Sequence, residues 1–135
     1  MIVLGVDFGE KRVGLAISDM LGMIAQPLET LSVKSVDDAI AQVAEVATQK
    51  NAELIVVGMP INMNASVGKK AQEAAAFAEA LGNAVEIDVK TWDERLSSVA
   101  ADRAMRSAGM SCKKRKGHRD KIAATIILQG YLDAQ

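Results

Sequence analysis

A single carboxylate stands at the end of a short apolar run near the start of the chain. The run Ile2-Val3-Leu4-Gly5-Val6 leads to Asp7, and Gly9 follows before a second apolar run begins. Such a run is typical of a strand buried on both faces, and open α/β sheets place their chemistry at the carboxyl ends of strands. An ionised carboxylate there needs hydrogen-bond donors, a basic side chain or a metal ion beside it, because burying it unpaired is costly. Asp7 is therefore the first candidate for a functional residue.

Three further carboxylates occur where strands are predicted to end or helices to begin: Asp93, Glu94 and Asp120. We expect these side chains to converge with Asp7. Two carboxylates about 5 Å apart repel by roughly 3 kcal/mol at an effective dielectric constant of about 20, so a converged group needs a cation or a proton. Oxygen ligands favour Mg²⁺ or Mn²⁺, which at such a cluster promote the hydrolysis of phosphodiester bonds. The single histidine and single cysteine do not build a zinc or copper site.

Each carboxylate also has a purely structural interpretation. Asp7 could accept hydrogen bonds from backbone N–H groups of its own turn. Asp93 and Asp120 could each cap the helix predicted to follow, with Glu94 as a charge on its first turn. The combination of the four residues favours the functional interpretation.

Basic residues suggest where an anionic partner would bind. The net charge is only −1, but residues 113–135 carry 6 basic and 2 acidic groups, whereas residues 1–112 carry 10 basic and 15 acidic groups. Six basic residues within nine positions predict a local anion-binding patch in a loop, whose alternative is an ordinary solvated loop: Lys113, Lys114, Arg115, Lys116, Arg119 and Lys121. Asn62 and Lys69 flank the start of a predicted helix, which is either a site for a nucleic-acid phosphate or an ordinary capped helix. Lys11, Arg12 and Arg95 complete the expected contacts with nucleic acid.

The apolar pattern predicts strands over 2–6, 12–18, 23–31, 54–57 and 85–89, with Pro27 marking an edge strand or a bulge. It predicts helices over 36–49 with Ser35 as the N-cap, over 66–81 with Gly82 as the stop, over 96–108, and from about residue 120 to 132. The first three strands follow one another directly, and the later strands alternate with helices. This order predicts an α/β fold: a mixed five-stranded sheet, antiparallel at first and then parallel, with helices on both faces.

Length and composition narrow the class of protein. The chain of 135 residues is expected to form one domain, 1–135, and its single cysteine excludes an internal disulfide. Aromatic residues make up only 3% of the chain, so base stacking on aromatic side chains is not expected to dominate recognition. No secretory signal and no apolar run long enough to span a membrane is visible, which points to the reducing cytoplasm. The pattern does not indicate an oligomeric state.

Several motifs together resemble the YqgF (RuvX) family of ribonuclease-H-like proteins, described as Holliday junction resolvases and as nucleases that process the precursor of 16S ribosomal RNA. The resemblance runs nearly from end to end, through the segments Gly5-Val-Asp7-Phe-Gly9, Lys11-Arg12-Val-Gly14, Ser18-Asp19, Val57-Gly58-Met-Pro60, Asp93-Glu94-Arg95, Asp120-Lys-Ile-Ala123-Ala124, Ile127-Leu128 and Tyr131-Leu132. It implies a ribonuclease-H-like fold and a site made of Asp7, Asp93 or Glu94, and Asp120. Two departures concern loops: Glu10 replaces a small hydroxylated residue and could add a fourth carboxylate, and Asn64-Ala65 replaces a glycine-containing turn.

The leading hypothesis is a metal-dependent endonuclease that uses Mg²⁺ or Mn²⁺ and acts on precursor ribosomal RNA or on branched DNA, in possible contact with ribosomal particles. Asp7, Glu94 and Asp120 would be the metal ligands. A second hypothesis is a nucleic-acid- or ribosome-binding module whose acidic site is vestigial. A third is a phosphotransferase of the actin-like superfamily, but such enzymes close two related domains over a nucleotide and this chain has room for one.

Overall fold

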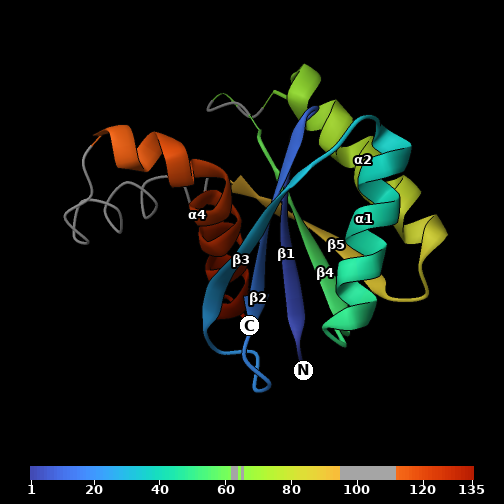
Figure 1. The fold of residues 1–135 in the computed structure, drawn as a ribbon, viewed down its shortest axis with the longest axis vertical. Helices are drawn as coiled ribbons and strands as arrows, with labels where there is room; N and C mark the ends of the chain where they lie inside the picture. The colour runs from blue at the N-terminus through green and yellow to red at the C-terminus, as the bar shows by residue number, and fades with distance from the viewer. Residues whose placement is uncertain (62–63, 65, 95–111) are drawn as a thin grey trace.

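A computed structural model of the chain describes residues 1–61, 64, 66–94 and 112–135, and for residues 112–121 only the backbone. Its centre is a five-stranded sheet with the spatial order β3-β2-β1-β4-β5 (Figure 1). The strands are β1 (Val3–Phe8), β2 (Arg12–Ser18), β3 (Ala25–Ser32), β4 (Leu54–Met59) and β5 (Asp88–Asp93). The pairs β1–β2 and β2–β3 are antiparallel, and the pairs β1–β4 and β4–β5 are parallel. The predicted mixed sheet is confirmed.

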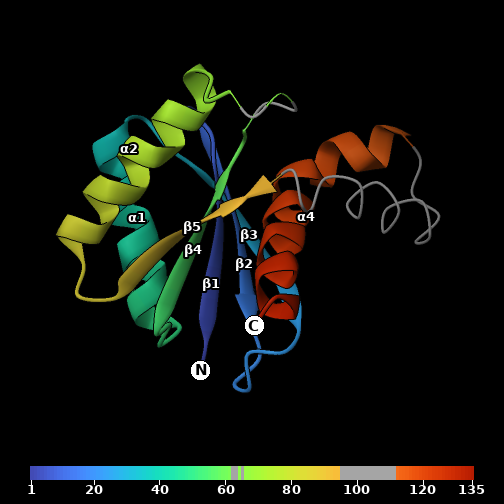
Figure 2. The same cartoon turned by 180° about the vertical axis from the view of Figure 1, so that it is seen from behind.

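Helices cover both faces of the sheet, as predicted. The helices α1 (Val36–Gln49) and α2 (Lys69–Ala84) lie on one face, and α4 (Cys112–Asp133) lies on the other (Figure 2). α1 begins as the sequence predicts, because the side chain of Ser35 accepts a hydrogen bond from the backbone N–H of Asp38 at 3.1 Å. In the described part of the chain, no helix is both long and apolar enough to cross a membrane.

Alternation along the strands divides the core into two clusters. On β1, Leu4 and Val6 pack toward α1 and α2, and Val3 packs toward α4. Gly5 shares the α4 face: a Cβ atom there would lie 2.7 Å from Cβ of Leu128 and 3.1 Å from the carbonyl oxygen of Ala124. The glycine therefore lets α4 approach the sheet more closely than any side chain would allow. Gly5, and with it every second residue of β1, faces α4.

The strand predictions are correct in order and direction. β3 is an edge strand, and Pro27 pairs with Ala16 directly beside a shift in register, so the proline occupies both an edge and a bulge. β5 begins at Asp88 rather than at Val85. The apolar residues that suggested the earlier start, Val85 and Ile87, pack against the core from the connection that precedes the strand.

Two helix predictions need correction, and a third is not tested. α2 begins at Lys69 with Gly68 as its N-cap, not at Ser66, and it continues through Gly82 to Ala84, because a helix interior tolerates one glycine at a modest cost. The predicted basic loop is wrong: residues 113–119 are helical, since lysine and arginine are good helix formers. Asp120 therefore lies inside α4 and is not its N-cap. The helix predicted over 96–108 lies outside the described residues.

Candidate active site at the carboxyl edge of the sheet

Asp7 lies near the carboxyl end of β1, where it pairs in register with Gly14 of β2. On the other side, the parallel pairing of Val6 with Val57 brings Asp7 level with Gly58 of β4. Because side chains alternate along a strand, Asp7 shares the α4 face with Val3 and Gly5. Its side chain is half-buried. The sequence prediction that Asp7 emerges at this edge is confirmed.

Glu94 follows β5 directly, and its side chain lies on Gly58. A Cβ atom at Gly58 would be 3.1 Å from both Cγ and Cδ of Glu94, and 2.5 Å from Cδ1 of Ile127 in α4. The carboxyl group of Glu94 thus occupies space that a side chain on β4 would fill. Neighbouring strands are about 4.8 Å apart, so Asp7 projects from the adjacent strand at the same level and from the same face as this carboxyl group.

Asp93 lies on the opposite face of the sheet from Glu94. It pairs in register with Met59, one residue beyond Gly58, and alternation turns that position toward the α1 and α2 face. Trp92, which pairs with Gly58, lies on the α4 face of the sheet. Its ring makes an edge-on contact with Tyr131 of α4 at a centroid distance of 5.8 Å. The sequence left open whether Asp93 or Glu94 joins Asp7. The geometry places Glu94, not Asp93, on the face of Asp7.

The surroundings of Glu94 disfavour its charged form. Burial raises the pKa of this carboxyl group above its ordinary value, and the negative charge of the adjacent Asp93 raises it further. A cation beside the carboxylate would oppose both effects, because it stabilises the ionised form. The electrostatic setting of Glu94 is therefore that of a group that gains from a bound cation.

Asp120, the third predicted ligand, lies in α4 one helical turn before Ala124, which packs on Gly5. Residues four apart share a face of a helix, so its backbone continues the row of residues that meets the sheet. Its side chain lies outside the described residues. Among the side chains that the structure describes, no three of the types histidine, cysteine, aspartate and glutamate come together as a metal-binding group.

A hollow lies beside the β1–β2 turn, on the face of the sheet that α2 covers. It has a volume of about 430 Å³ and is lined by Phe8, Gly9, Glu10, Lys11, Lys69, Lys70 and Glu73. The lysines come from the β1–β2 turn and from the first turn of α2, whose N-cap Gly68 makes no side-chain capping hydrogen bond. The ring of Phe8 stacks on Phe77 at a centroid distance of 4.4 Å and holds the turn against α2. Lys11 and Lys69 are thus brought together, and Glu10 lies with them.

The remaining predicted nucleic-acid contacts are only partly placed. Arg12 is exposed at the start of β2. Asn62 and Arg95 lie outside the described residues, as do the side chains of the basic segment in α4: Lys113, Lys114, Arg115, Lys116 and Arg119.

The sequence did not single out Gly58 and Ile127 as site residues. A glycine that directly follows four apolar strand residues, as Gly58 follows Val57, was the available signal, because a glycine in a strand often marks a close approach of other groups. Nothing in the sequence indicated that Glu94 would be one of these groups. That contact depends on the pairing of β4 with β5 and on the position of α4.

Comparisons with known proteins indicate the family of this chain. The family model described as RuvX: Holliday junction resolvase matches residues 1–134. A protein of Clostridium novyi, named "Putative pre-16S rRNA nuclease", is 46% identical over 134 residues that cover 99% of both chains. A protein of the same name from Bacillus cytotoxicus is 45% identical over 137 residues and covers 100% of both.

Solved structures show the same fold at low sequence identity. RuvC of Thermus thermophilus in complex with a Holliday junction substrate is 20% identical, with a TM-score of 0.61 over 99% of this chain and 94% of that one. The fowlpox virus Holliday junction resolvase is 14% identical, with a TM-score of 0.59 over 100% of both chains. The predicted ribonuclease-H-like fold is confirmed. The match of the family model to nearly the whole sequence, together with the similar relatives, shows that this chain belongs to the RuvX family.

Proposed function

We propose that this protein is a metal-dependent endonuclease that hydrolyses phosphodiester bonds in the precursor of 16S ribosomal RNA. The observation that carries the proposal is the placement of Asp7 and Glu94 on one face at the carboxyl edge of the sheet, with Glu94 seated on Gly58. The names of the similar proteins support the choice of substrate. The activity would reside in one domain, 1–135, and work in the cytoplasm on ribosomal precursor particles.

The donors fit a hard divalent cation. Asp7 and Glu94 offer only oxygen atoms, the ligands that Mg²⁺ and Mn²⁺ prefer. The raised pKa of Glu94 supports the fit, because burial and Asp93 both disfavour its charge unless a cation lies nearby. We propose Asp120 as the third ligand. When bound, the ion would polarise a phosphoryl oxygen and lower the pKa of a coordinated water molecule.

The other residues would hold the substrate. Lys11, Lys69 and Lys70 line the hollow beside the β1–β2 turn, close to the strand that carries Asp7, and outnumber Glu10 and Glu73 there. They can neutralise phosphates of the nucleic-acid backbone. The basic segment Lys113 to Arg119, at the start of α4, would bind further phosphates of the same nucleic acid. Arg12, Asn62 and Arg95 would make additional contacts. Since these contacts are electrostatic, binding should weaken as salt rises.

Cleavage of branched DNA is a second candidate function. The fold is that of RuvC, which was solved in complex with a Holliday junction substrate, and of the fowlpox virus resolvase. Both activities would use the same carboxylates, so the substrate has to be decided by experiment.

Cleavage assays with Asp7→Asn test the proposal. The substrates are an RNA that contains the 16S sequence with its precursor extension, a four-way DNA junction, and a linear DNA duplex, each with Mg²⁺, Mn²⁺ or EDTA. We expect the parent protein to cut the RNA only with a metal ion, and Asp7→Asn and Glu94→Gln to lose at least about a hundredfold in rate while still binding RNA. Glu29→Gln, an exposed carboxylate on β3, is the matched control and should cut normally.

Three outcomes would contradict the proposal. Equal rates of cleavage by Asp7→Asn and by the parent would show that the carboxylate of Asp7 is not needed for the reaction. Binding of RNA without cleavage of the RNA or of the four-way DNA junction would favour a nucleic-acid-binding module. Tight binding of ATP in calorimetry would favour a phosphotransferase.

A further inference from the structure

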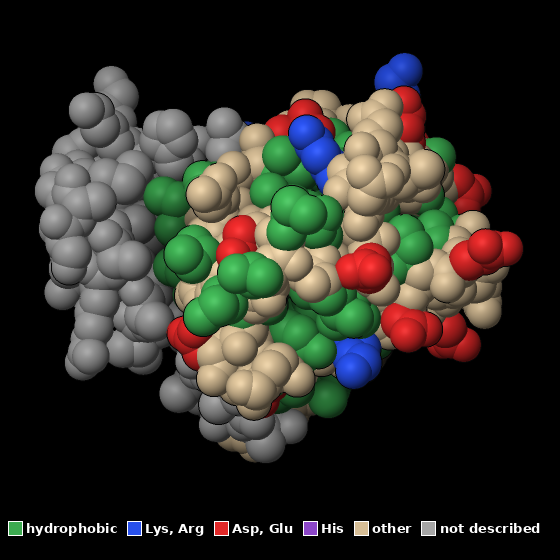
Figure 3. Space-filling view, turned by 90° about the horizontal axis from the view of Figure 1, so that it is seen from below, with side chains coloured by type: hydrophobic (Ala, Val, Ile, Leu, Met, Phe, Trp, Pro, Cys, Tyr) green, Lys and Arg blue, Asp and Glu red, His purple; other side chains and the backbone are tan. Residues whose placement is uncertain are grey.

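The edge of the sheet opposite the candidate active site carries an unusual group of exposed apolar side chains. In the β2–β3 loop, Met20, Leu21, Met23 and Ile24 are 78%, 77%, 65% and 58% exposed, and the neighbouring Met1 is 61% exposed. Seen from below, apolar side chains gather across the middle of this face, with acidic side chains and some basic ones around them (Figure 3). Single exposed apolar residues are ordinary, but a contiguous group marks an interaction site.

Hydrogen bonds hold this loop in one conformation. One carboxylate oxygen of Asp19 accepts from the backbone N–H groups of Met23 and Ile24 at 2.7 and 3.0 Å, and the Asp19 N–H donates to the Ile24 carbonyl at 3.1 Å. Gly22 supplies the left-handed backbone conformation of the turn, with φ of 70°. The apolar side chains are thus presented by a fixed loop, and a partner would lose little conformational entropy of this loop on binding.

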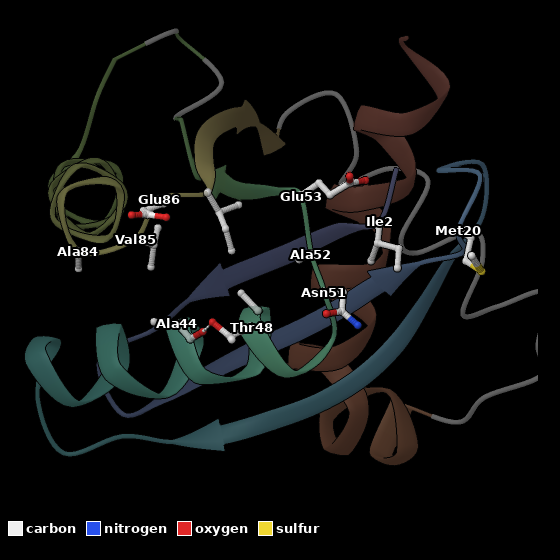
Figure 4. Close-up of a pocket in the computed structure, with 12 residues that line it drawn as sticks. Ile2, Met20, Ala44, Thr48, Asn51, Ala52, Glu53, Ala84, Val85 and Glu86 are labelled. Atoms are coloured by element: carbon white, nitrogen blue, oxygen red, sulfur yellow. Dashed lines mark hydrogen bonds between the residues drawn. The ribbon is translucent and has the colours of Figure 1, made fainter.

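A groove of about 810 Å³ lies next to the loop, and Met20 belongs to both. Its lining comes from the end of α1, the connection that follows α1, the end of α2, and the connection to β5 (Figure 4). Most of the lining is apolar or small: Ile2, Met20, Ala44, Ala47, Ala52, Ala84, Val85 and Ile87. Within the described chain, Glu53 and Glu86 are the charged side chains that line it, and no lysine or arginine does. The N-terminal ammonium of Met1 lies 4.0 Å from Oε2 of Glu53 and partly offsets that charge, and it donates a hydrogen bond to the carbonyl of Met20.

We propose that this loop and groove form a docking surface for a basic polypeptide segment of a partner protein. Apolar side chains of the segment would enter the groove and contact Met20 and Leu21. Its lysine or arginine side chains would lie against Glu86 and would share Glu53 with the exposed N-terminal ammonium. Charge decides the occupant: a nucleic acid would be repelled by both glutamates, and a symmetric second copy would bring each pair of glutamates toward the other. The surface lies away from Asp7 and Glu94, so a bound partner leaves the candidate active site open.

The test uses two synthetic helical peptides of about sixteen residues, long enough for four helical turns. Both carry leucine at positions i, i+4, i+7 and i+11; one has lysine and the other glutamate at the flanking positions. We expect the lysine peptide to bind the full chain in a fluorescence anisotropy titration and the glutamate peptide to bind at least about tenfold more weakly. NMR shifts in the complex should map to the β2–β3 loop and to residues 44–53 and 84–87.

Matched variants separate this surface from general charge effects. Glu53→Lys combined with Glu86→Lys should weaken the binding of the lysine peptide about tenfold and tighten the binding of the glutamate peptide. Met20→Ser, at a side chain that is 78% exposed, should weaken the binding of both peptides without affecting folding. Glu29→Lys makes a similar change of charge away from the groove and should have little effect. RNA cleavage should be unchanged in all of these variants.

Other outcomes overturn the proposal. Equal binding of both peptides, or binding that the groove variants do not alter, would exclude charge-selective docking here. Failure of both peptides to bind would do the same. A dimer in sedimentation velocity that Met20→Ser disrupts would assign the surface to a second copy instead.

Discussion

Replacing Gly58 by alanine should both destabilise the protein and impair the candidate active site. The added Cβ would lie 2.5 Å from Cδ1 of Ile127 and 3.1 Å from Cγ and Cδ of Glu94. Carbon atoms prefer separations of about 3.5 to 4.0 Å, so Ile127 would have to retreat by about 1 Å and Glu94 by a few tenths of an ångström. Overpacking of this kind typically costs about 1 to 3 kcal/mol.

A double-mutant cycle separates the two effects. Ile127→Val removes the methyl group that the new Cβ would meet most closely, at a cost of about 0.5 to 1.5 kcal/mol by itself. In the double variant with Gly58→Ala, the loss of stability should be clearly smaller than the sum of the single losses. The contact with Glu94 is unchanged by the valine. Cleavage should therefore stay depressed, by about tenfold or more, because small displacements of catalytic groups reduce rates strongly.

Gly82→Ala is the matched control. Gly82 lies inside α2, where a Cβ would be 3.8 Å from its nearest neighbour, Cβ of Val89. The same substitution should stabilise the protein there by about 0.5 to 1 kcal/mol and leave cleavage unchanged.

Urea unfolding monitored by circular dichroism gives the stabilities, and RNA cleavage with Mg²⁺ gives the rates at a temperature at which all variants are folded. If Gly58→Ala is as stable as the parent and cuts RNA at the parent rate, the assigned packing of Glu94 and Ile127 on β4 is refuted. Full recovery of activity in the double variant would show that Gly58 affects the reaction only through α4.

Two further predictions concern stability. Burial raises the pKa of Glu94 above 4.5, so the folded protein holds the proton of this carboxyl group more tightly than the unfolded chain does. The stabilisation that Glu94 contributes in its protonated form is therefore lost as pH rises through the folded pKa. Glu94→Gln should therefore raise the urea midpoint at pH 7 in EDTA and lose that advantage near pH 4; an equal effect at both pH values would contradict the assigned burial. Ser35→Ala removes the side-chain cap of α1 and should cost about 1 kcal/mol in urea unfolding, and an unchanged midpoint would show that the cap contributes nothing.

The sequence alone determined the elements and their order. The doubly buried pattern of β1 and β4, the N-cap Ser35 and the alternation of strands with helices are local signals, because each depends on the backbone preferences and polarity of neighbouring residues. From these, the mixed sheet follows through the rules of strand connection, and Asp7 falls at the carboxyl edge without further information. The start of α4 was predicted wrongly, because the density of like charges was taken as the sign of a loop although lysine and arginine are good helix formers.

Only the tertiary structure decided which carboxylate joins Asp7. Asp93 and Glu94 are adjacent in the chain, so their side chains go to opposite faces. The register of β5 against β4 decides which of the two lies on the face of Asp7. The seat of Glu94 on Gly58 and the close fit of α4 on Gly5 likewise join residues far apart in sequence. Neither contact leaves a pattern in the chain, because a glycine that admits another group looks in sequence like a glycine that simply turns the backbone.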